Sequence, residues 1–208
     1  MTWLDLLKTA RTILEKAGIP ASEWSFGGGT ALALFLQHRE SRDIDIFFTD
    51  AQYLTLLTPR LNPTTAGMSS DYIEAASFLK LKLNTGEIDF IVAPYLTSPP
   101  YFRIELQDEQ VNIETPAEIV LKKLFFRTET LKARDIIDTA AVYQERKGEL
   151  LSQARLLLPR LDILQRRWTK LQQIYYREAQ ALLITQKELL EKAPALFTAF
   201  LHDVHRLS

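Results

Sequence analysis

The sequence changes character near residue 110, and this change restricts the fold more than any other feature. Strand-like segments occur only before it, between helix-like ones, whereas every periodic segment after Thr115 has helical spacing. Strands grouped in one part of a chain and helices in another are typical of α+β proteins. We therefore expect a mixed, largely antiparallel sheet with flanking helices over residues 1–110, followed by a helical region over residues 111–208.

Four segments predict the strands of this sheet. Residues 78–83 and 87–92 have strand-like patterns on either side of Asn84-Thr85-Gly86, which predicts a hairpin. Residues 43–48 and 101–106 have the same character. Helices are expected over residues 3–17, 30–38, 116–127, 133–146, 161–175 and 179–192.

Composition excludes several classes of protein. The 208 residues are 47% hydrophobic and include no cysteine, so the chain can fill a core but has no disulfide, thiolate zinc site or cysteine nucleophile. No stretch approaches the roughly 20 apolar residues of a membrane helix, and the first residues do not resemble an export signal. We expect a cytoplasmic protein that does not interact with a membrane.

Charge is distributed unevenly along the chain. Residues 1–115 contain 9 Lys and Arg against 15 Asp and Glu, whereas residues 116–208 contain 16 against 11. A basic half can contact a polyanion such as RNA, although two solvated surfaces account for the same counts. The basic side chains that recur along the expected C-terminal helices are Arg155, Arg160, Arg166, Arg167, Lys170 and Arg177.

A run of three glycines leads into the second expected helix. Gly27-Gly28-Gly29 precedes Thr30, whose hydroxyl is suited to cap a helix and to donate to a phosphate oxygen. Glycines allow close approach of the backbone to a phosphate, and a helix N-terminus attracts the negative charge. Alone, such a run more often marks a tight turn. No Gly-Lys-Ser/Thr follows, so this is not a Walker loop.

Acidic residues supply the other half of a phosphate-transfer site. Asp43 and Asp45 are two apart in an expected strand, so they share one face about 6.6 Å apart and can bind Mg²⁺. Asp89 lies in a segment that reads as a buried strand, where an unpaired charge is costly. If the two strands are neighbours, three carboxylates converge on Mg²⁺ or Mn²⁺. Alternatively, Asp89 caps a turn or pairs with Lys80 or Lys82 across the hairpin.

These motifs resemble those of the AbiEii/AbiGii nucleotidyltransferase toxins, within the DNA-polymerase-β-like superfamily. The resemblance rests first on residues 27–34, Gly-Gly-Gly-Thr-Ala-Leu-Ala-Leu, and on residues 42–47, Arg-Asp-Ile-Asp-Ile-Phe. Residues 118–124 and 132–138 are similar to the later motifs of that family, in which a helix lysine and an Arg-Asp pair complete the site. The similarity extends from about Phe26 to Tyr143.

The resemblance implies roles for particular residues. It makes Asp43 and Asp45 metal ligands, Lys123 a contact to nucleotide phosphate, and Asp135 the acidic member of the final motif. The residues implied to cradle phosphate are Gly28, Gly29 and Thr30. Asp89 matches the third carboxylate of the wider superfamily, so either Asp89 or Asp135 is the third essential acid.

Alternatives remain for the residues of the helical region. Lys122 is the competing lysine in the doublet. Asp135 could orient Lys123, act as a base towards the acceptor, or complement a helix dipole. Asp138 is four residues after Arg134, a spacing that favours a surface ion pair. The three histidines are expected in helices and outside the site.

The implied activity is transfer of a nucleoside monophosphate from an NTP to an acceptor, with Mg²⁺ or Mn²⁺ as cofactor. The resemblance favours RNA, especially tRNA, as acceptor, with the helical region completing the site and a separately encoded antitoxin as partner. Alternatives are a protein-modifying nucleotidyltransferase and a catalytically degenerate module that binds RNA or protein. Asp-x-Asp phosphatases fit poorly because Phe47 occupies the position of their Thr or Val, and metal-dependent glycosyltransferases do not explain the glycine turn.

Overall fold

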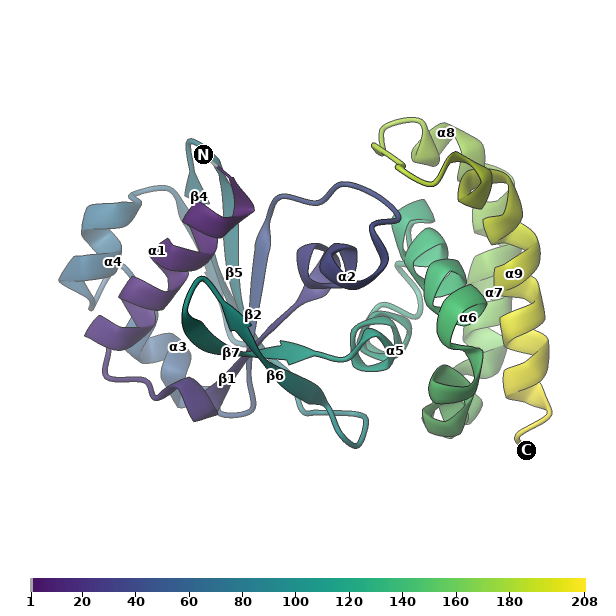
Figure 1. Ribbon diagram of the computed structural model, residues 1–208, viewed down its shortest axis with the longest axis horizontal. Coiled ribbons are helices and arrows are strands. Elements are labelled where there is room, and N and C mark those ends of the chain that lie inside the picture. Colours follow the sequence, from purple (N-terminus) through teal and green to yellow (C-terminus); the bar gives the residue numbers. More distant parts are fainter. Residues whose placement is uncertain (1) are drawn as a thin grey trace. The chain divides into compact units, whose positions relative to one another are not determined.

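The computed structural model describes residues 2–208, which form two compact units (Figure 1). Unit 1 comprises the residues up to Ala31 together with Ser41–Tyr95 and Tyr101–Glu114. Unit 2 comprises Leu32–Glu40, Leu96–Pro100 and Thr115–Ser208. The chain passes between the two units several times, the first time within a helix.

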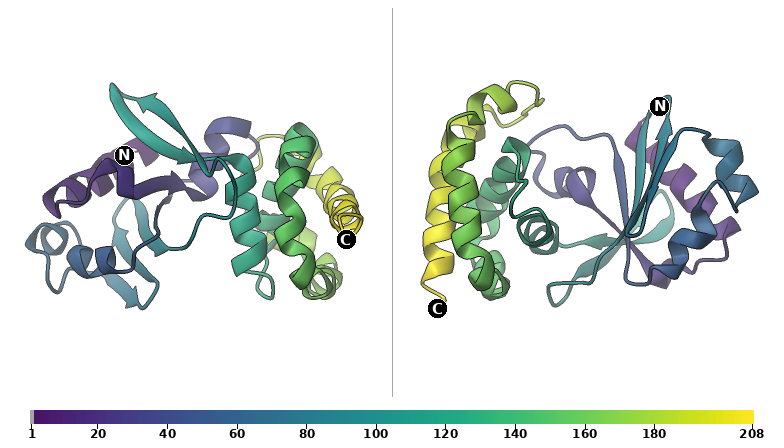
Figure 2. Two further views of the ribbon diagram at one scale, coloured as in Figure 1. Left: turned by 90° about the horizontal axis from the view of Figure 1, so that it is seen from below. Right: turned by 180° about the vertical axis from the view of Figure 1, so that it is seen from behind.

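Unit 1 is built on a sheet whose strand order, within residues 2–208, is β3-β4-β5-β2-β1-β7-β6. Neighbours pair antiparallel except β5 with β2 and β1 with β7, which are parallel. The expected mixed, largely antiparallel sheet is thus confirmed, and β6 and β7 form a hairpin at its edge (Figure 2). The strands are β1 (Trp24–Gly27), β2 (Ile44–Phe48), β3 (Tyr72–Ala75), β4 (Phe78–Leu83), β5 (Gly86–Val92), β6 (Tyr101–Leu106) and β7 (Glu109–Glu114).

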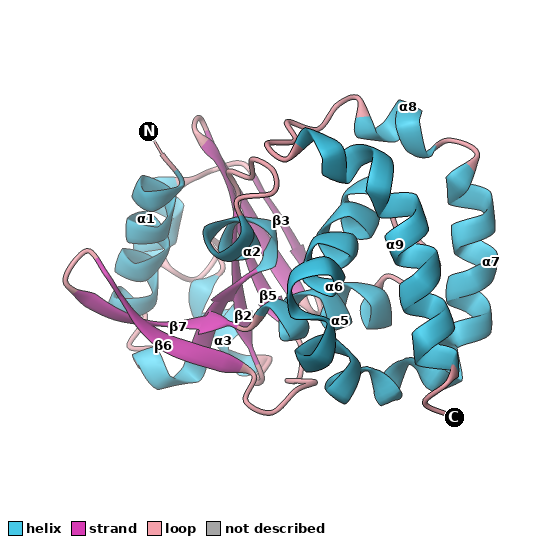
Figure 3. Cartoon of the chain, turned by 45° about the vertical axis from the view of Figure 1, so that its right-hand side comes forward, coloured by secondary structure: helices cyan, strands magenta, loops and turns pink. Residues whose placement is uncertain are grey.

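Helices complete unit 1 and make up the regular structure of unit 2 (Figure 3). Those of unit 1 are α1 (Trp3–Lys16), the 3-10 turn η1 (Ala21–Glu23), α3 (Gln52–Leu57) and α4 (Pro63–Met68). The helix α2 (Gly28–Leu36) begins in unit 1 and ends in unit 2. Unit 2 also contains α5 (Pro116–Phe126), α6 (Ala133–Gln153), η2 (Ala154–Arg160), α7 (Leu161–Gln172), α8 (Tyr175–Ala179) and α9 (Lys187–His205).

The two faces of the sheet differ in polarity. Ile44, Ile46 and Phe48 of β2 are fully buried on the face that α1 covers, where Trp3 stacks on Phe26 with ring centroids 6.1 Å apart. Side chains alternate between the faces of a strand. The opposite face therefore carries the residues between these apolar ones, among them the acidic residues that the sequence singles out.

Several predicted elements are confirmed. The hairpin forms from β4 and β5, and β2 and β6 match the other two expected strands. The side chain of Thr115 accepts a hydrogen bond from the N–H of Glu118, with Pro116 in the first helical position, so α5 begins where the capping pattern predicts. No helix within residues 2–208 is long and apolar enough to cross a membrane.

Two helix predictions are wrong. Residues 181–186 are not helical, because the backbone of this segment pairs with residues 38–40: Glu40 donates to the carbonyl of Leu183, and Thr185 donates to that of His38. The helix after the glycine turn begins at Gly28, so Thr30 lies inside it instead of capping it. His38 follows the end of this helix and is not helical.

The core of unit 2 follows the spacing of its apolar residues. Five apolar residues spaced three and four apart within residues 161–175 are all buried, although one helix ends at Gln172 and the next begins at Tyr175. They are Leu161, Leu164, Trp168, Leu171 and Tyr175. The helix expected over residues 133–146 continues to Gln153 as α6, with non-helical backbone angles at Arg146.

Candidate active site

Four residues form a row across the sheet of unit 1, on the face opposite α1. Lys80 of β4 is in register with Asp89 of β5, Asp89 with Asp45 of β2, and Asp45 with Gly27 of β1. Residues in register on neighbouring strands point to the same face. The strand that begins directly after Asp43 is thus adjacent to the strand of Asp89, as expected, but it is Asp45 that lies side by side with Asp89.

The glycine turn packs against this row so closely that larger residues do not fit. A Cβ on Gly28 would lie 1.7 Å from Oδ2 of Asp45, and the φ of Gly28 is +71°. A Cβ on Gly27 would lie 2.4 Å from Oε2 of Glu114 and 2.7 Å from the ring of Phe47. Glycine is thus required for space at both positions and for backbone conformation at Gly28.

Thr30 and Asp43 are tied to each other. The hydroxyl of Thr30 donates to the backbone carbonyl of Asp43 at 2.5 Å. The carboxylate of Asp43, just before β2, accepts the N–H of Glu87 at 3.1 Å. Asp43 is exposed, whereas Thr30 is buried. These contacts hold Asp43 near the start of β5 and Thr30 under the loop that leads into β2.

Asp89 occupies a partly buried position beside two charged side chains. Its Oδ2 lies 3.0 Å from Nζ of Lys80, while its Oδ1 is buried without a hydrogen-bond partner in the structure. Burial raises the pKa of Asp89 to about 6; Lys80 opposes this shift and the charge of Asp45 adds to it. The hairpin pairing with Lys80 that the sequence left as an alternative is therefore present.

The pair of acids fits a divalent cation. Carboxylate oxygens are the ligands that Mg²⁺ prefers, and Oδ1 of Asp89 is a buried acceptor that lacks a donor. Among residues 2–208, no group of three or more His, Cys, Asp or Glu side chains is placed to hold a metal ion. Mg²⁺ is commonly held by one or two carboxylates and completes its shell with water and phosphate oxygens, so two acids suffice as the protein's share.

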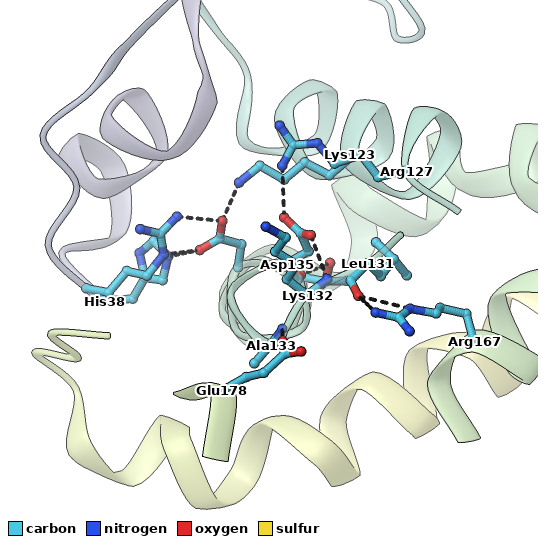
Figure 4. A network of polar contacts seen from close by, with 12 residues as sticks. His38, Lys123, Arg127, Leu131, Lys132, Ala133, Asp135, Arg167 and Glu178 are labelled. Atoms are coloured by element: carbon cyan, nitrogen blue, oxygen red, sulfur yellow. Dashed lines mark hydrogen bonds and ion pairs between the residues drawn. The ribbon is translucent and has the colours of Figure 1, made fainter. Parts of the chain in front are cut away.

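The residues expected in the helical region belong to a polar network within unit 2 (Figure 4). Lys123 is nearly buried, and its ammonium group donates to Oδ2 of Asp138. Asp135 is fully buried; it accepts the N–H of Lys132 at 3.0 Å, and Arg127 lies 3.5 Å from its other oxygen. Asp135 thus caps α6, as a dipole-complementing acid does.

Asp138 is the centre of this network, which sequence reasoning missed. Its fully buried carboxylate accepts hydrogen bonds from Nε2 of His38 at 2.7 Å and from Nε and Nη2 of Arg39 at 2.6 and 2.9 Å. Burial alone would raise the pKa of Asp138, but the charges of Lys123 and Arg39 hold it well below its usual range. The surface pair expected between Arg134 and Asp138 is wrong, because Asp138 faces the core.

Lys122 has a different partner from its neighbour. Its ammonium lies 3.2 Å from Oε1 of Glu118, one turn earlier in α5. The carboxylate of Glu118 is fully buried and also accepts the N–H groups of Leu96 and Thr97, at 3.0 and 2.8 Å. Lys122 is thereby tied to the segment 96–100, whereas Lys123 is tied to Asp138.

Glu114 is a second buried acid without a sequence signal. It ends β7, accepts the hydroxyl of Ser25 at 3.0 Å, and is fully buried against Gly27. Its position at a strand end gave no pattern that distinguishes it from an exposed glutamate. It supports the glycine turn from the side opposite Asp45.

Replacing Gly28 with alanine should remove most of the activity. The methyl group would overlap the carboxylate of Asp45, and the positive φ adds a strain of roughly 1–2 kcal/mol. Gly18→Ala is the matched control, because Gly18 has a φ of +72° but nothing within 4 Å of the added Cβ. Backbone strain should lower the Tm of both variants, the overlap with Asp45 should lower that of Gly28→Ala further, and only Gly28→Ala should lose the activity of the site. Equal activity in both variants would contradict the close packing.

Comparison with known proteins shows the family and the fold of the chain. The sequence profile described as "Nucleotidyl transferase AbiEii toxin, Type IV TA system" matches residues 13–207. A candidate nucleotidyltransferase from Helicobacter pylori has the same fold, with a TM-score of 0.56, 17% identity, and coverage of 99% of this chain and 97% of its own. JHP933 from Helicobacter pylori has a TM-score of 0.54 at 16% identity, with coverage of 99% and 94%. No protein of curated function matches in sequence.

Fold and profile together define the class of this protein as a nucleotidyltransferase. Because the profile spans nearly the whole chain, the protein belongs to the AbiEii family of nucleotidyltransferase toxins from type IV toxin–antitoxin systems. The α+β fold expected from the sequence is confirmed by the structure and by its similarity to these two solved structures.

Proposed function

We propose that this nucleotidyltransferase moves a nucleoside monophosphate from an NTP to RNA, with a tRNA end as the first candidate, and that it requires Mg²⁺ or Mn²⁺. The observation that carries the proposal is the Asp45–Asp89 pair beside Gly28 at the first turn of α2. The family description also supports a separately encoded antitoxin as partner.

The residues of unit 1 have distinct tasks in this proposal. Asp45 and Asp89 would hold the cation, and Asp43 is kept as the further ligand that the family resemblance implies; when bound, the cation would offset negative charge on the α-phosphate and on the departing pyrophosphate. The first N–H groups of a helix lack partners within it, so the backbone of Gly28 and Gly29 can donate to phosphate oxygens. The hydroxyl of Thr30 positions Asp43 by donating to the backbone carbonyl of Asp43. The same hydroxyl could donate to a phosphate oxygen instead.

The helical region is proposed to contribute Lys123, Asp135 and a surface for the acceptor. Of the recurring basic residues, Arg160 lies 4.0 Å from the ring centroid of Phe125, and Arg167 donates to the carbonyl of Leu131. Others are exposed; Arg166 and Lys170 are one turn apart on α7. This pair is suited to contact RNA phosphates.

Labelled nucleotides test the proposal directly. Purified protein is incubated with each α-labelled NTP, total cellular RNA and Mg²⁺ or Mn²⁺, and the products are separated by size beside a reaction without RNA. Label in a tRNA-sized band is the expected result. Label on protein alone would assign the chain as a protein-modifying enzyme, and no label with either metal would favour a binding module.

Lys123→Ala should raise the KM for the NTP by about tenfold or more, because it removes a cation proposed to contact phosphate. Lys122→Ala is the matched control: it removes the partner of Glu118 and should reduce stability without changing that KM. Lys123→Ala also removes a partner of the buried Asp138, so both variants should be less stable in thermal melts, and initial rates over a range of NTP concentrations should show a raised KM in Lys123→Ala alone. A raised KM in Lys122→Ala alone would transfer the role to Lys122.

A further inference from the structure

Lys80 lies at one end of the polar row, which is the row of four residues in register, Lys80, Asp89, Asp45 and Gly27. It is next to the acids proposed to bind metal. It is directly opposite Asp89 across the antiparallel β4–β5 pair. Its ammonium group is 3.0 Å from Oδ2 of Asp89 and also donates to Oε2 of Glu87. Lys80 therefore has two carboxylate partners, and only Asp89 is in register with Asp45.

The ion pair is largely protected from water. The side chains of Lys80 and Asp89 are 23% and 18% exposed. Charges in such a position are screened less than charges at the surface, and two neighbouring carboxylates repel each other. When no metal is bound, a cation beside Asp89 offsets this repulsion in the folded protein, and Lys80 is the side chain that provides it.

Only one oxygen of Asp89 is satisfied by this lysine. Oδ1 is buried and has no hydrogen-bond partner in the structure. An ammonium group that binds one oxygen of a carboxylate leaves the other oxygen available to a metal ion. Glu87 lies two positions before Asp89 on β5, opposite Lys82 and farther from Asp45, and it can retain Lys80 if Asp89 exchanges its partner.

We propose that Lys80 is the resident counter-ion of the Asp45–Asp89 pair, which keeps Asp89 in place until a divalent cation displaces the ammonium group towards Glu87. Lys80 is then a positioning residue that weakens metal binding by the protein alone. This inference rests on the metal-dependent function proposed above. It unites the two interpretations of Asp89, as a metal ligand and as the hairpin partner of a lysine.

Direct measurement of metal binding tests this role without relying on activity. Mn²⁺ is titrated into the full chain, and free Mn²⁺ is followed by its electron paramagnetic resonance signal. Lys80→Met should bind Mn²⁺ at least about tenfold more tightly than the unmodified protein, because the competing charge is gone. Lys80→Arg, which keeps the charge, should bind within about threefold of it.

Lys82→Met is the matched control. Lys82 is on the same strand and carries the same charge, but its ammonium lies 3.4 Å from Asp71 instead of beside the acid pair. We expect its Mn²⁺ affinity to change by less than about twofold. Adding Asp45→Asn to Lys80→Met should abolish the tighter binding, which would place the bound ion at the acid pair.

Several results would overturn the inference. Unchanged or weaker Mn²⁺ binding in Lys80→Met would do so, as would an equal gain in Lys80→Met and Lys82→Met, which would indicate a general charge effect. If Lys80→Met fails to fold, Lys80→Gln retains hydrogen bonding and must show the same gain. No Mn²⁺ binding by any of these proteins would overturn the proposed metal dependence itself, and the role of Lys80 with it.

Discussion

Asp45→Asn should abolish nucleotide transfer while leaving the fold intact. A bound cation contributes several kcal/mol of charge stabilisation in phosphoryl transfer, and each ~1.4 kcal/mol is a factor of ten in rate. Loss of a ligand at the centre of the polar row should therefore lower the rate by at least about a hundredfold. Transfer of label from an α-labelled NTP measures this change.

Asp45→Asn should not lower the stability of the folded protein, although it lowers the activity. The charge of Asp45 acts against ionisation of its neighbour Asp89, so its removal relieves repulsion in the folded state. We expect a Tm equal to or slightly above that of the unmodified protein. Asp71→Asn is the control, since Asp71 is 70% exposed and lies outside the row; it should retain full activity. Full activity of Asp45→Asn would be incompatible with the proposed mechanism.

Asp138→Ala should cause the largest loss of stability. Without this carboxylate, Arg39 and Lys123 remain in a buried position with no opposite charge from Asp138, and Nε2 of His38 loses its partner. Breaking a buried ion pair on one side typically costs about 3–5 kcal/mol. Chemical denaturation of the variant should show a decrease in unfolding free energy of this size.

Acid sensitivity provides a second measurement on the same residue. Because the folded protein holds the pKa of Asp138 well below its usual range, the stability from this group is fully present above about pH 4 and is lost as pH falls further. Asp138→Asn should lack this part of the acid dependence. Glu188→Ala is the control: Glu188 is 83% exposed and pairs with Lys192 on the surface of α9, so its loss should leave the unfolding free energy nearly unchanged. A comparable cost for both alanine variants would contradict the central role of Asp138.

Much of the fold was predictable because its signals are local. The β4–β5 hairpin has a two-residue turn before Gly86, and α5 begins with a capping threonine and a proline in the first helical position. The strands that sequence patterns missed lack such signals. In β1 all four residues are buried, so no alternation is present, and β3 at the sheet edge is mostly exposed.

The candidate site shows the same division between local and distant information. Asp43, Asp45 and the glycines belong to short motifs, each of which can be recognised from one segment of the sequence. Asp138 gave no such signal, because its main partners are Lys123, 15 residues before it, and His38, 100 residues before it. The spacing to Arg134 indicated a surface pair only because helical neighbours are visible in sequence and partners on other elements are not.

The sequence by itself determined the alternation of polar and apolar residues, the glycine turn and the family motifs, since each depends on residues a few positions apart. Only the tertiary structure decided that Lys80, Asp89, Asp45 and Gly27 form one row, and that Asp138 faces the core. Strand order and register bring these groups together, and they follow from packing of the whole sheet. The partner of each charged group therefore depends on the tertiary structure and not on the neighbouring positions in the chain.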